Sequence, residues 1–200
     1  MTRTTGRQPI SLAILFIVTG LAGLLAAFNL ILDRFILTED ADARLSCDIN
    51  PFVSCGTVIQ SAQGEIFGFP NPMIGIMAFV APVAVGVSLL AGARFASWYW
   101  GLFNVGLLGG IVFIHWLMTQ SVYVIGALCP WCLLVWLVMI PLFWYGTVNN
   151  LARNFGLRGG AQRFFQKLLP FTWMIVLLNY LIIVLIIVQN FPLLIPYLFG

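Results

Sequence analysis

Five apolar segments, each near or above the length needed to cross a membrane, constrain this chain more than any other feature of its sequence. They span residues 10–32, 69–90, 98–125, 127–148 and 169–188. A helix needs about 20 apolar residues to cross the hydrocarbon core, and a segment in lipid must satisfy its backbone polar groups internally. The sequence therefore predicts an all-α integral membrane protein with five transmembrane helices.

The composition agrees with a lipid environment. Charged residues make up 8% of the chain and hydrophobic residues 62%, whereas soluble domains carry about 25% charged residues. The first apolar segment exceeds the roughly 7 to 15 residues of a signal-peptide core, so we expect it to be a retained helix. The net charge of +3 comes from residues that flank the apolar segments, and we expect no nucleic-acid partner.

Charge asymmetry predicts the orientation. Seven of the nine basic residues flank the helices on one side: Arg3, Arg7, Arg94, Arg153, Arg158, Arg163 and Lys167. All six acidic residues lie in the segment 33–68. Cytoplasmic loops carry the excess of Lys and Arg, so we expect a cytoplasmic N-terminus and an extracytoplasmic 33–68 loop. Five spans then place the C-terminus outside as well.

The predicted organisation is one bundle with an appended helix. Residues 1–150 form a four-helix bundle, residues 151–168 a cytoplasmic linker, and residues 169–200 a fifth transmembrane helix with a short tail. Within the 33–68 loop, Ser54 precedes a stretch that we expect to form a short helix on the membrane surface, with Ser54 as its N-cap.

All four cysteines fall on the predicted outer side, where disulfides persist. Cys47 and Cys55 lie in the acidic loop, and Cys129 and Cys132 form a CPWC motif at the start of the fourth helix. A disulfide across two residues closes too small a loop to stabilise much, but it makes a good redox couple. Pro130 suits the first helical turn, which places Cys129 near the N-cap, where a thiolate is favoured. Cys132 lies about 4.5 Å deeper.

Two other interpretations of the cysteines stay open. One alternative is that the four residues form two structural disulfides with no redox role. A four-cysteine zinc site is the other alternative. The spacings C-x7-C and C-x2-C are not a matched zinc-binding pair, and an oxidising compartment disfavours free thiolates, so we expect no metal.

A disulfide in a membrane needs an electron acceptor, and a quinone is the lipid-soluble two-electron acceptor. Asn71, at the outer end of the second helix, is placed to donate to a quinone carbonyl; the alternative is a helix cap. His115 is a candidate because it is an intramembrane histidine, although an interhelical hydrogen bond would explain it equally well. Aromatic walls for the ring, or an interfacial belt, would come from Trp131, Trp136, Phe67 and Phe69.

The pattern of motifs resembles the vitamin K epoxide reductase family, in its bacterial branch that oxidises disulfide-forming proteins. The matching pieces are CDINPFVSC at 47–55, NPMIG at 71–75 and CPWC at 129–132, and the similarity covers roughly residues 10–150. The resemblance implies a four-helix bundle around a quinone, capped by the loop. By analogy Cys47 meets the partner protein, Cys55 exchanges with Cys129, Cys132 reduces the quinone and Asn71 contacts its head group.

The chain departs from the family pattern in two places. Trp136 stands where animal members carry a tyrosine, so a phenolic contact to the ring is lost. Some bacterial members continue into a thioredoxin-like domain, whereas this sequence ends at Gly200, and we expect that partner to be a separate protein.

The resulting expectation is a quinone-coupled thiol oxidase of the bacterial inner membrane. It would reoxidise a thioredoxin-like (DsbA-type) protein outside the membrane and pass the electrons to menaquinone or ubiquinone. One alternative is reduction of vitamin K epoxide on the same scaffold. A quinone-coupled oxidase of the DsbB type carries its CxxC before its second cysteine pair, the reverse of the order here. The alternative of another class is a non-enzymatic membrane protein with structural disulfides.

Overall fold

The computed structural model describes residues 8–155 and 159–192, and within them the fold is helical. Five helices are long and apolar enough to cross a membrane, which confirms the predicted all-α, multi-span architecture. They are α1 (Ile10–Glu39), α3 (Pro72–Leu90), α4 (Ser97–Gln120), α5 (Pro130–Asn149) and α7 (Thr172–Asn190).

Shorter helical elements connect or extend these five. The segment between α1 and α3 contains α2 (Cys55–Ile59) and the 3-10 turn η1 (Ala62–Glu65). Two π-helical segments, η2 (Ser121–Ile125) and η3 (Asn150–Asn154), extend α4 and α5. Before α7 come the amphipathic helix α6 (Gly160–Leu168) and η4 (Leu169–Phe171). The predicted linker 151–168 therefore contains a helix.

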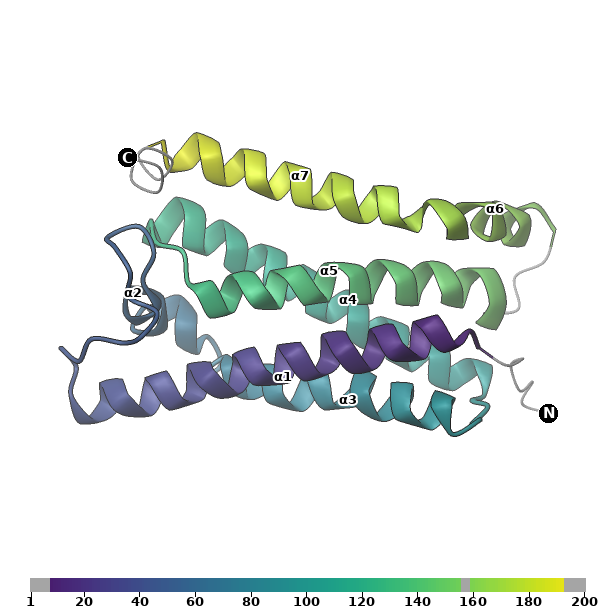
Figure 1. Ribbon diagram of the computed structural model, residues 1–200, viewed down its shortest axis with the longest axis horizontal. Coiled ribbons are helices and arrows are strands. Elements are labelled where there is room, and N and C mark those ends of the chain that lie inside the picture. The colour runs from purple at the N-terminus through teal and green to yellow at the C-terminus, as the bar shows by residue number, and fades with distance from the viewer. Residues whose placement is uncertain (1–7, 156–158, 193–200) are drawn as a thin grey trace.

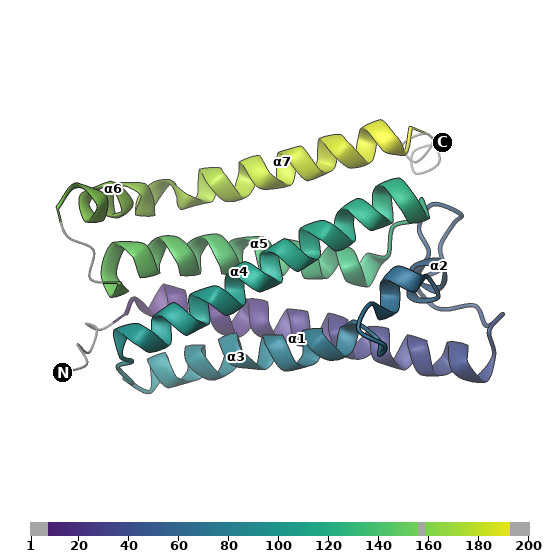
Figure 2. The same cartoon turned by 180° about the vertical axis from the view of Figure 1, so that it is seen from behind.

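The long helices run side by side (Figures 1 and 2). Helix α1 packs against α3 and α5, α4 packs against α5, and α7 packs on the outside of α5. We call the end of the bundle where α1 ends and α3 and α5 begin the cysteine end, because all four cysteines lie there. Helix α2 lies at this end and α6 at the opposite end (Figure 1).

Close contact between α1 and α3 depends on glycine. A Cβ atom on Gly86 of α3 would lie 2.7 Å from the Ala13 carbonyl oxygen of α1. A Cβ atom on Gly23 of α1 would lie 2.5 Å from the ring of Phe79. Small residues let two helix backbones approach, and van der Waals packing is a main source of helix association in lipid. These contacts set the spacing between α1 and α3.

Helix α1 is longer than its apolar segment, so the predicted loop boundary at residue 33 is wrong. The helix continues to Glu39, and its last two turns bury Asp33 and Leu37 against the loop. An apolar segment marks the part of a helix that suits lipid, whereas backbone hydrogen bonds continue beyond it as long as tertiary contacts support them. The connecting segment therefore spans residues 40–71, which we call the cap loop.

Most of the described basic residues lie at the end of the bundle opposite the acidic residues, whereas Arg34 and Arg44 lie with the acidic residues at the cysteine end. Arg94, in the turn between α3 and α4, lies at the opposite end, as do Arg153 of η3 and Arg163 and Lys167 of α6. The acidic residues lie at the cysteine end. Arg3, Arg7, Arg158 and the tail from residue 193 lie outside the described residues. Helix α7 ends at the cysteine end (Figure 1), as an odd number of spans requires.

Candidate functional site

The cap loop is folded around the side chain of Asp48. Its carboxylate accepts hydrogen bonds from the backbone N–H of Leu45 and of Gly56, both at 3.0 Å, and from the Ser54 hydroxyl at 2.8 Å. Partial burial alone would raise the pKa of Asp48, but these hydrogen bonds lower it below its ordinary value. The Ser54 hydroxyl accepts from the N–H of Thr57, which confirms Ser54 as the N-cap of α2.

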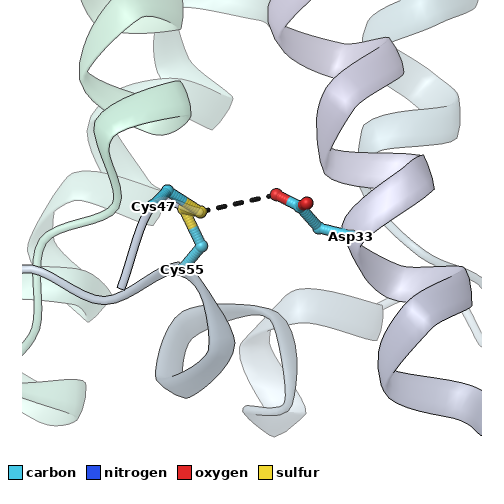
Figure 3. Close-up of side chains that lie close together, drawn as sticks. All are labelled: Asp33, Cys47 and Cys55. Carbon is cyan, nitrogen blue, oxygen red and sulfur yellow. Dashed lines mark hydrogen bonds between the residues drawn. A yellow bond between two sulfur atoms is a disulfide. The ribbon is translucent and has the colours of Figure 1, made fainter. Parts of the chain in front are cut away.

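The first cysteine pair is joined within this loop. Cys47 and Cys55 form a disulfide with their Cα atoms 5.7 Å apart, and Figure 3 shows their sulfur atoms facing the C-terminal part of α1. Cys55 is the first residue of α2. Both cysteines belong to a small apolar cluster with Leu30 and Leu37 of α1 and with Cys129, so water has little access to the disulfide.

Two backbone hydrogen bonds bring the cap loop to the start of α5. The N–H of Ser54 donates to the carbonyl of Leu128, and the N–H of Leu128 donates to the carbonyl of Phe52. The next residue on each segment is a cysteine. The sulfur atoms of Cys55 and Cys129 consequently lie 3.3 Å apart, with side chains 0% and 1% exposed. The structure thus brings together the two cysteines that the family resemblance pairs for exchange.

The CPWC motif begins α5. Cys129 is the N-cap, in an extended conformation, and Pro130 occupies the first helical position, as the sequence predicts. Cys129 and Cys132 are free thiols. A hydrogen bond from the Cys132 side chain lowers the pKa of Cys129, and the backbone N–H groups of Cys132 and Trp131 add to this effect against the opposing influence of burial. Cys129 is therefore the sulfur of this pair suited to be a thiolate.

Cys132 faces a cavity. The cavity has a volume of 600 Å³ and is lined by residues of α1, α3, α4 and α5, most of them apolar. Such a volume lies within the range of about 300–1,000 Å³ typical of small-molecule sites. Three predicted cofactor-binding residues, Asn71, Cys132 and Trp136, lie on its wall. The cavity thus places the Cys132 side chain beside a space between the helices.

Asn71 does not cap α3 with its side chain, so the capping alternative is wrong. Its side-chain amide donates to the Gln63 carbonyl at 2.6 Å, and its side-chain oxygen accepts from the N–H of Ile66 at 3.3 Å. These bonds tie the start of α3 to the cap loop and hold the Asn71 amide at the cavity wall. An amide NH₂ group carries two hydrogens, and the Gln63 carbonyl takes one of them.

Of the four aromatic residues expected near the ring, one lies on the cavity wall. Trp136 is buried on the cavity wall. Phe67 and Phe69 stack on each other with exposed rings, and neither they nor Trp131 are among the lining residues. The aromatic rings that line the cavity beside Trp136 went unrecognised in the sequence: Phe79, Tyr99, Phe103 and Phe113. Helices that are apolar on every side give no periodic signal for the face that borders a cavity.

His115 bonds within its own helix rather than between helices. Its Nδ1 lies 2.8 Å from the carbonyl oxygen of Ile111, one turn earlier in α4, and it is not among the lining residues of the cavity.

Comparison with known protein families supports the same conclusion as the geometry. The profile of the Vitamin K epoxide reductase family matches residues 14–147, a range that contains the cap loop, all four cysteines and the cavity. The chain belongs to the vitamin K epoxide reductase family. A search of curated proteins returned no match. Members of the vitamin K epoxide reductase family are in general quinone-linked thiol/disulfide oxidoreductases, and the four cysteines of this chain gather at one end of its bundle.

Proposed function

We propose that this protein is a quinone-coupled thiol oxidase that reoxidises a thioredoxin-like (DsbA-type) protein. The observation that carries the proposal is the unbroken series from the Cys47–Cys55 disulfide, across a 3.3 Å contact to Cys129, to Cys132 on the cavity wall. Sulfur atoms about 3–3.5 Å apart are at the distance of a reactive encounter. Electrons therefore need no diffusing carrier between the partner and the cavity.

The electron transfers balance as thiol–disulfide exchanges. The partner's dithiol reduces Cys47–Cys55 and becomes a disulfide. The Cys55 thiolate then attacks Cys129 in the oxidised CPWC pair, which releases Cys132. Attack of Cys47 on Cys55 re-forms the loop disulfide and leaves Cys129 and Cys132 as thiols, the state present in the structure. Cys129 and Cys132 return to a disulfide by giving up two electrons and two protons.

The cavity suits a quinone, either menaquinone or ubiquinone, as the acceptor of these electrons. Its apolar lining matches a lipid-soluble ring and tail, and Cys132 lies on the wall beside Trp136. The second hydrogen of the Asn71 amide is the donor for a quinone carbonyl. A bound quinone would act as the two-electron acceptor. The chain's own residues position it and hold the reducing sulfur against it.

The charge separation supports an orientation in the bacterial inner membrane. With the basic end of the bundle in the cytoplasm, the cysteine end and the end of α7 lie outside, where the partner is found. A membrane-impermeant thiol reagent should then label reduced Cys47, the more exposed of the two loop cysteines, in intact cells, while a tag at Met1 stays protected. Labelling only after permeabilisation would refute this orientation.

The activity is tested with purified protein, a reduced thioredoxin-like protein, and ubiquinone or menaquinone. We expect quinone reduction coupled to disulfide formation in the partner. The Cys47→Ala/Cys55→Ala variant should lose oxidation of the protein partner but retain quinone reduction driven by dithiothreitol, which reaches the CPWC pair directly. Equal activity of this variant with the protein partner would contradict the relay. Reduction of vitamin K epoxide, with no activity on the quinone, would favour the alternative function.

A further inference from the structure

A buried carboxyl group touches the loop disulfide. Asp33, near the end of α1, places its Oδ2 atom 3.4 Å from the Sγ atom of Cys47 (Figure 3). The Asp33 side chain is 8% exposed, and Leu30 and Leu37 on the same helix belong to the apolar cluster around the sulfurs. Asp33 was assigned to the loop at the sequence level and given no role, and the relay described above does not use it.

Asp33 lacks the partner that a buried carboxylate needs. Within residues 8–155 and 159–192 it forms no ion pair. The neighbouring Arg34 pairs with Glu65 and donates to the Ile59 carbonyl instead. Asp48, on the cap loop, adds a second negative charge nearby. Burying an unpaired charge is costly, and such a group keeps its proton instead.

The contact with Cys47 points to the same protonation state. A disulfide sulfur carries no hydrogen and is only a weak acceptor. The hydrogen in an Asp33–Cys47 contact must then belong to the carboxyl group. When the disulfide is reduced, the situation reverses, because a Cys47 thiol can donate to an Asp33 carboxylate across the same contact. One proton satisfies the contact in both redox states.

We propose that Asp33 is a catalytic residue that exchanges one proton with Cys47 during thiol–disulfide exchange at the loop pair. The inference rests on the proposed function and adds a proton-transfer group to it. Its basis is the order of contacts from Asp33 to Cys47, through the disulfide to Cys55, and on to Cys129. Asp33 thus contacts Cys47, which lies at the opposite end of this series from Cys129.

That position determines when Asp33 acts. In the forward direction Cys55 is bonded to Cys129, and Cys47 is a thiol that must become a thiolate to attack Cys55. Asp33 takes the proton, the Cys47–Cys55 bond forms, the Cys55–Cys129 bond breaks, and Cys129 leaves as a thiolate. When the partner later reduces the loop pair, Cys47 departs as a thiolate and receives the proton back from Asp33. No proton has to enter or leave the apolar cluster in either step.

The test uses the Asp33→Asn variant, because an amide matches the size of the protonated carboxyl group but cannot take a proton from Cys47. A thiol without assistance titrates near pH 8.5, so at pH 6.5 only about 1% of it is thiolate. Loop-disulfide formation in the variant should therefore slow about 100-fold at pH 6.5 and recover about tenfold per pH unit up to about pH 8.5. Rapid acid quenching and peptide mapping should show a Cys55–Cys129 mixed disulfide that accumulates at pH 6.5 and not at pH 9.

Controls separate this role from a structural one. Glu39→Gln removes an exposed carboxyl from the same helix and should leave the rate and the pH profile unchanged, while Asp33→Glu should retain most of the neutral-pH rate. Arg34, Glu65, Asp48 and Cys129, the other ionisable groups around the site, are the same in all these variants. A wild-type pH profile in Asp33→Asn, without accumulated mixed disulfide, would overturn the inference. Absence of quinone reduction by the wild-type protein would instead refute the proposed function.

A second measurement needs no variant. Infrared difference spectra of the wild-type protein should show loss of a protonated-carboxyl band when the Cys47–Cys55 disulfide is reduced, and its return on oxidation. A carboxyl signal that does not respond to reduction of this disulfide would also overturn the inference, even if Asp33→Asn failed to fold.

Discussion

The contact between Cys55 and Cys129 predicts which sulfur of the CPWC motif receives electrons from the cap loop. Two double variants test Cys129 and Cys132 separately as the sulfur to which Cys55 bonds. Cys47→Ala/Cys132→Ala leaves only Cys55 and Cys129, and Cys47→Ala/Cys129→Ala leaves only Cys55 and Cys132. We expect the first variant to form its disulfide readily and the second to remain largely reduced.

The size of the difference follows from the geometry. The Cys55 and Cys129 sulfurs are 3.3 Å apart, and a disulfide bond is about 2.05 Å long, so they need to approach by only about 1.2 Å. Cys132 lies one turn further along α5, about 4.5 Å deeper. To reach it, the cap loop would have to break its two backbone hydrogen bonds with Leu128. At about 0.5–1.5 kcal/mol each, their loss disfavours the second disulfide by about 5- to 150-fold.

The assay is equilibration of both purified variants in the same glutathione redox buffers. Acid quenching, alkylation and peptide mapping without reduction then give the fraction of each variant that is cross-linked. At a buffer potential that oxidises half of the Cys55–Cys129 pair, no more than about one sixth of the Cys55–Cys132 pair should be oxidised, as an about 5-fold lower equilibrium constant requires. Equal or greater oxidation of the Cys55–Cys132 pair would refute the reasoning, and with it the separate roles of Cys129 and Cys132.

Three further predictions concern the cavity, the helix packing and the cap loop. Asn71→Ala should raise the quinone KM by at least about 3-fold, because it removes the proposed hydrogen bond to the quinone together with the bonds to Gln63 and Ile66 that hold the cavity wall; an unchanged KM would show that Asn71 does not contact the quinone. Gly86→Ala should lower the free energy of unfolding by about 1–3 kcal/mol through overpacking against α1, whereas Gly109→Ala, where a Cβ meets nothing within 4 Å, should not. Because the folded-state pKa of Asp48 is lowered, its stabilising contribution is complete above about pH 4 and is lost as the pH falls below that. The stability difference between wild type and Asp48→Asn should shrink accordingly in thermal unfolding between pH 6 and pH 2, and a constant difference would contradict the role of the carboxylate.

Local features of this protein could be predicted from its sequence because their causes are local. Lipid forces backbone groups to bond within their own segment, so apolar length alone predicted the five spanning helices. Pro130 and Ser54 marked the first turns of α5 and α2 for stereochemical reasons that involve only a few neighbouring residues. The CPWC spacing predicted a redox pair because two cysteines three residues apart at a helix start are necessarily close.

The arrangement of the site depended on contacts between distant segments. Cys55 and Cys129 are 74 residues apart, and they meet because backbone groups of Phe52 and Ser54 bond to Leu128, which no side-chain pattern in the sequence indicates. The sequence assigned Asp33 to the loop because the first apolar segment ends at residue 32. Helix α1 continues past that residue, and only the folded helix places the Asp33 carboxyl group against Cys47.

The cavity is the clearest case of a feature that only the tertiary structure decided. Its helices are apolar on all sides. The spacing of apolar residues along the sequence therefore does not indicate how each helix is rotated, or which aromatic rings line the cavity. That rotation is determined by close contacts such as those of Gly23 and Gly86 between α1 and α3. The sequence by itself determined which segments cross the membrane and which residues can carry electrons. The packing of the helices decided which of those residues touch, because side-chain contacts depend on the rotation and spacing of whole helices.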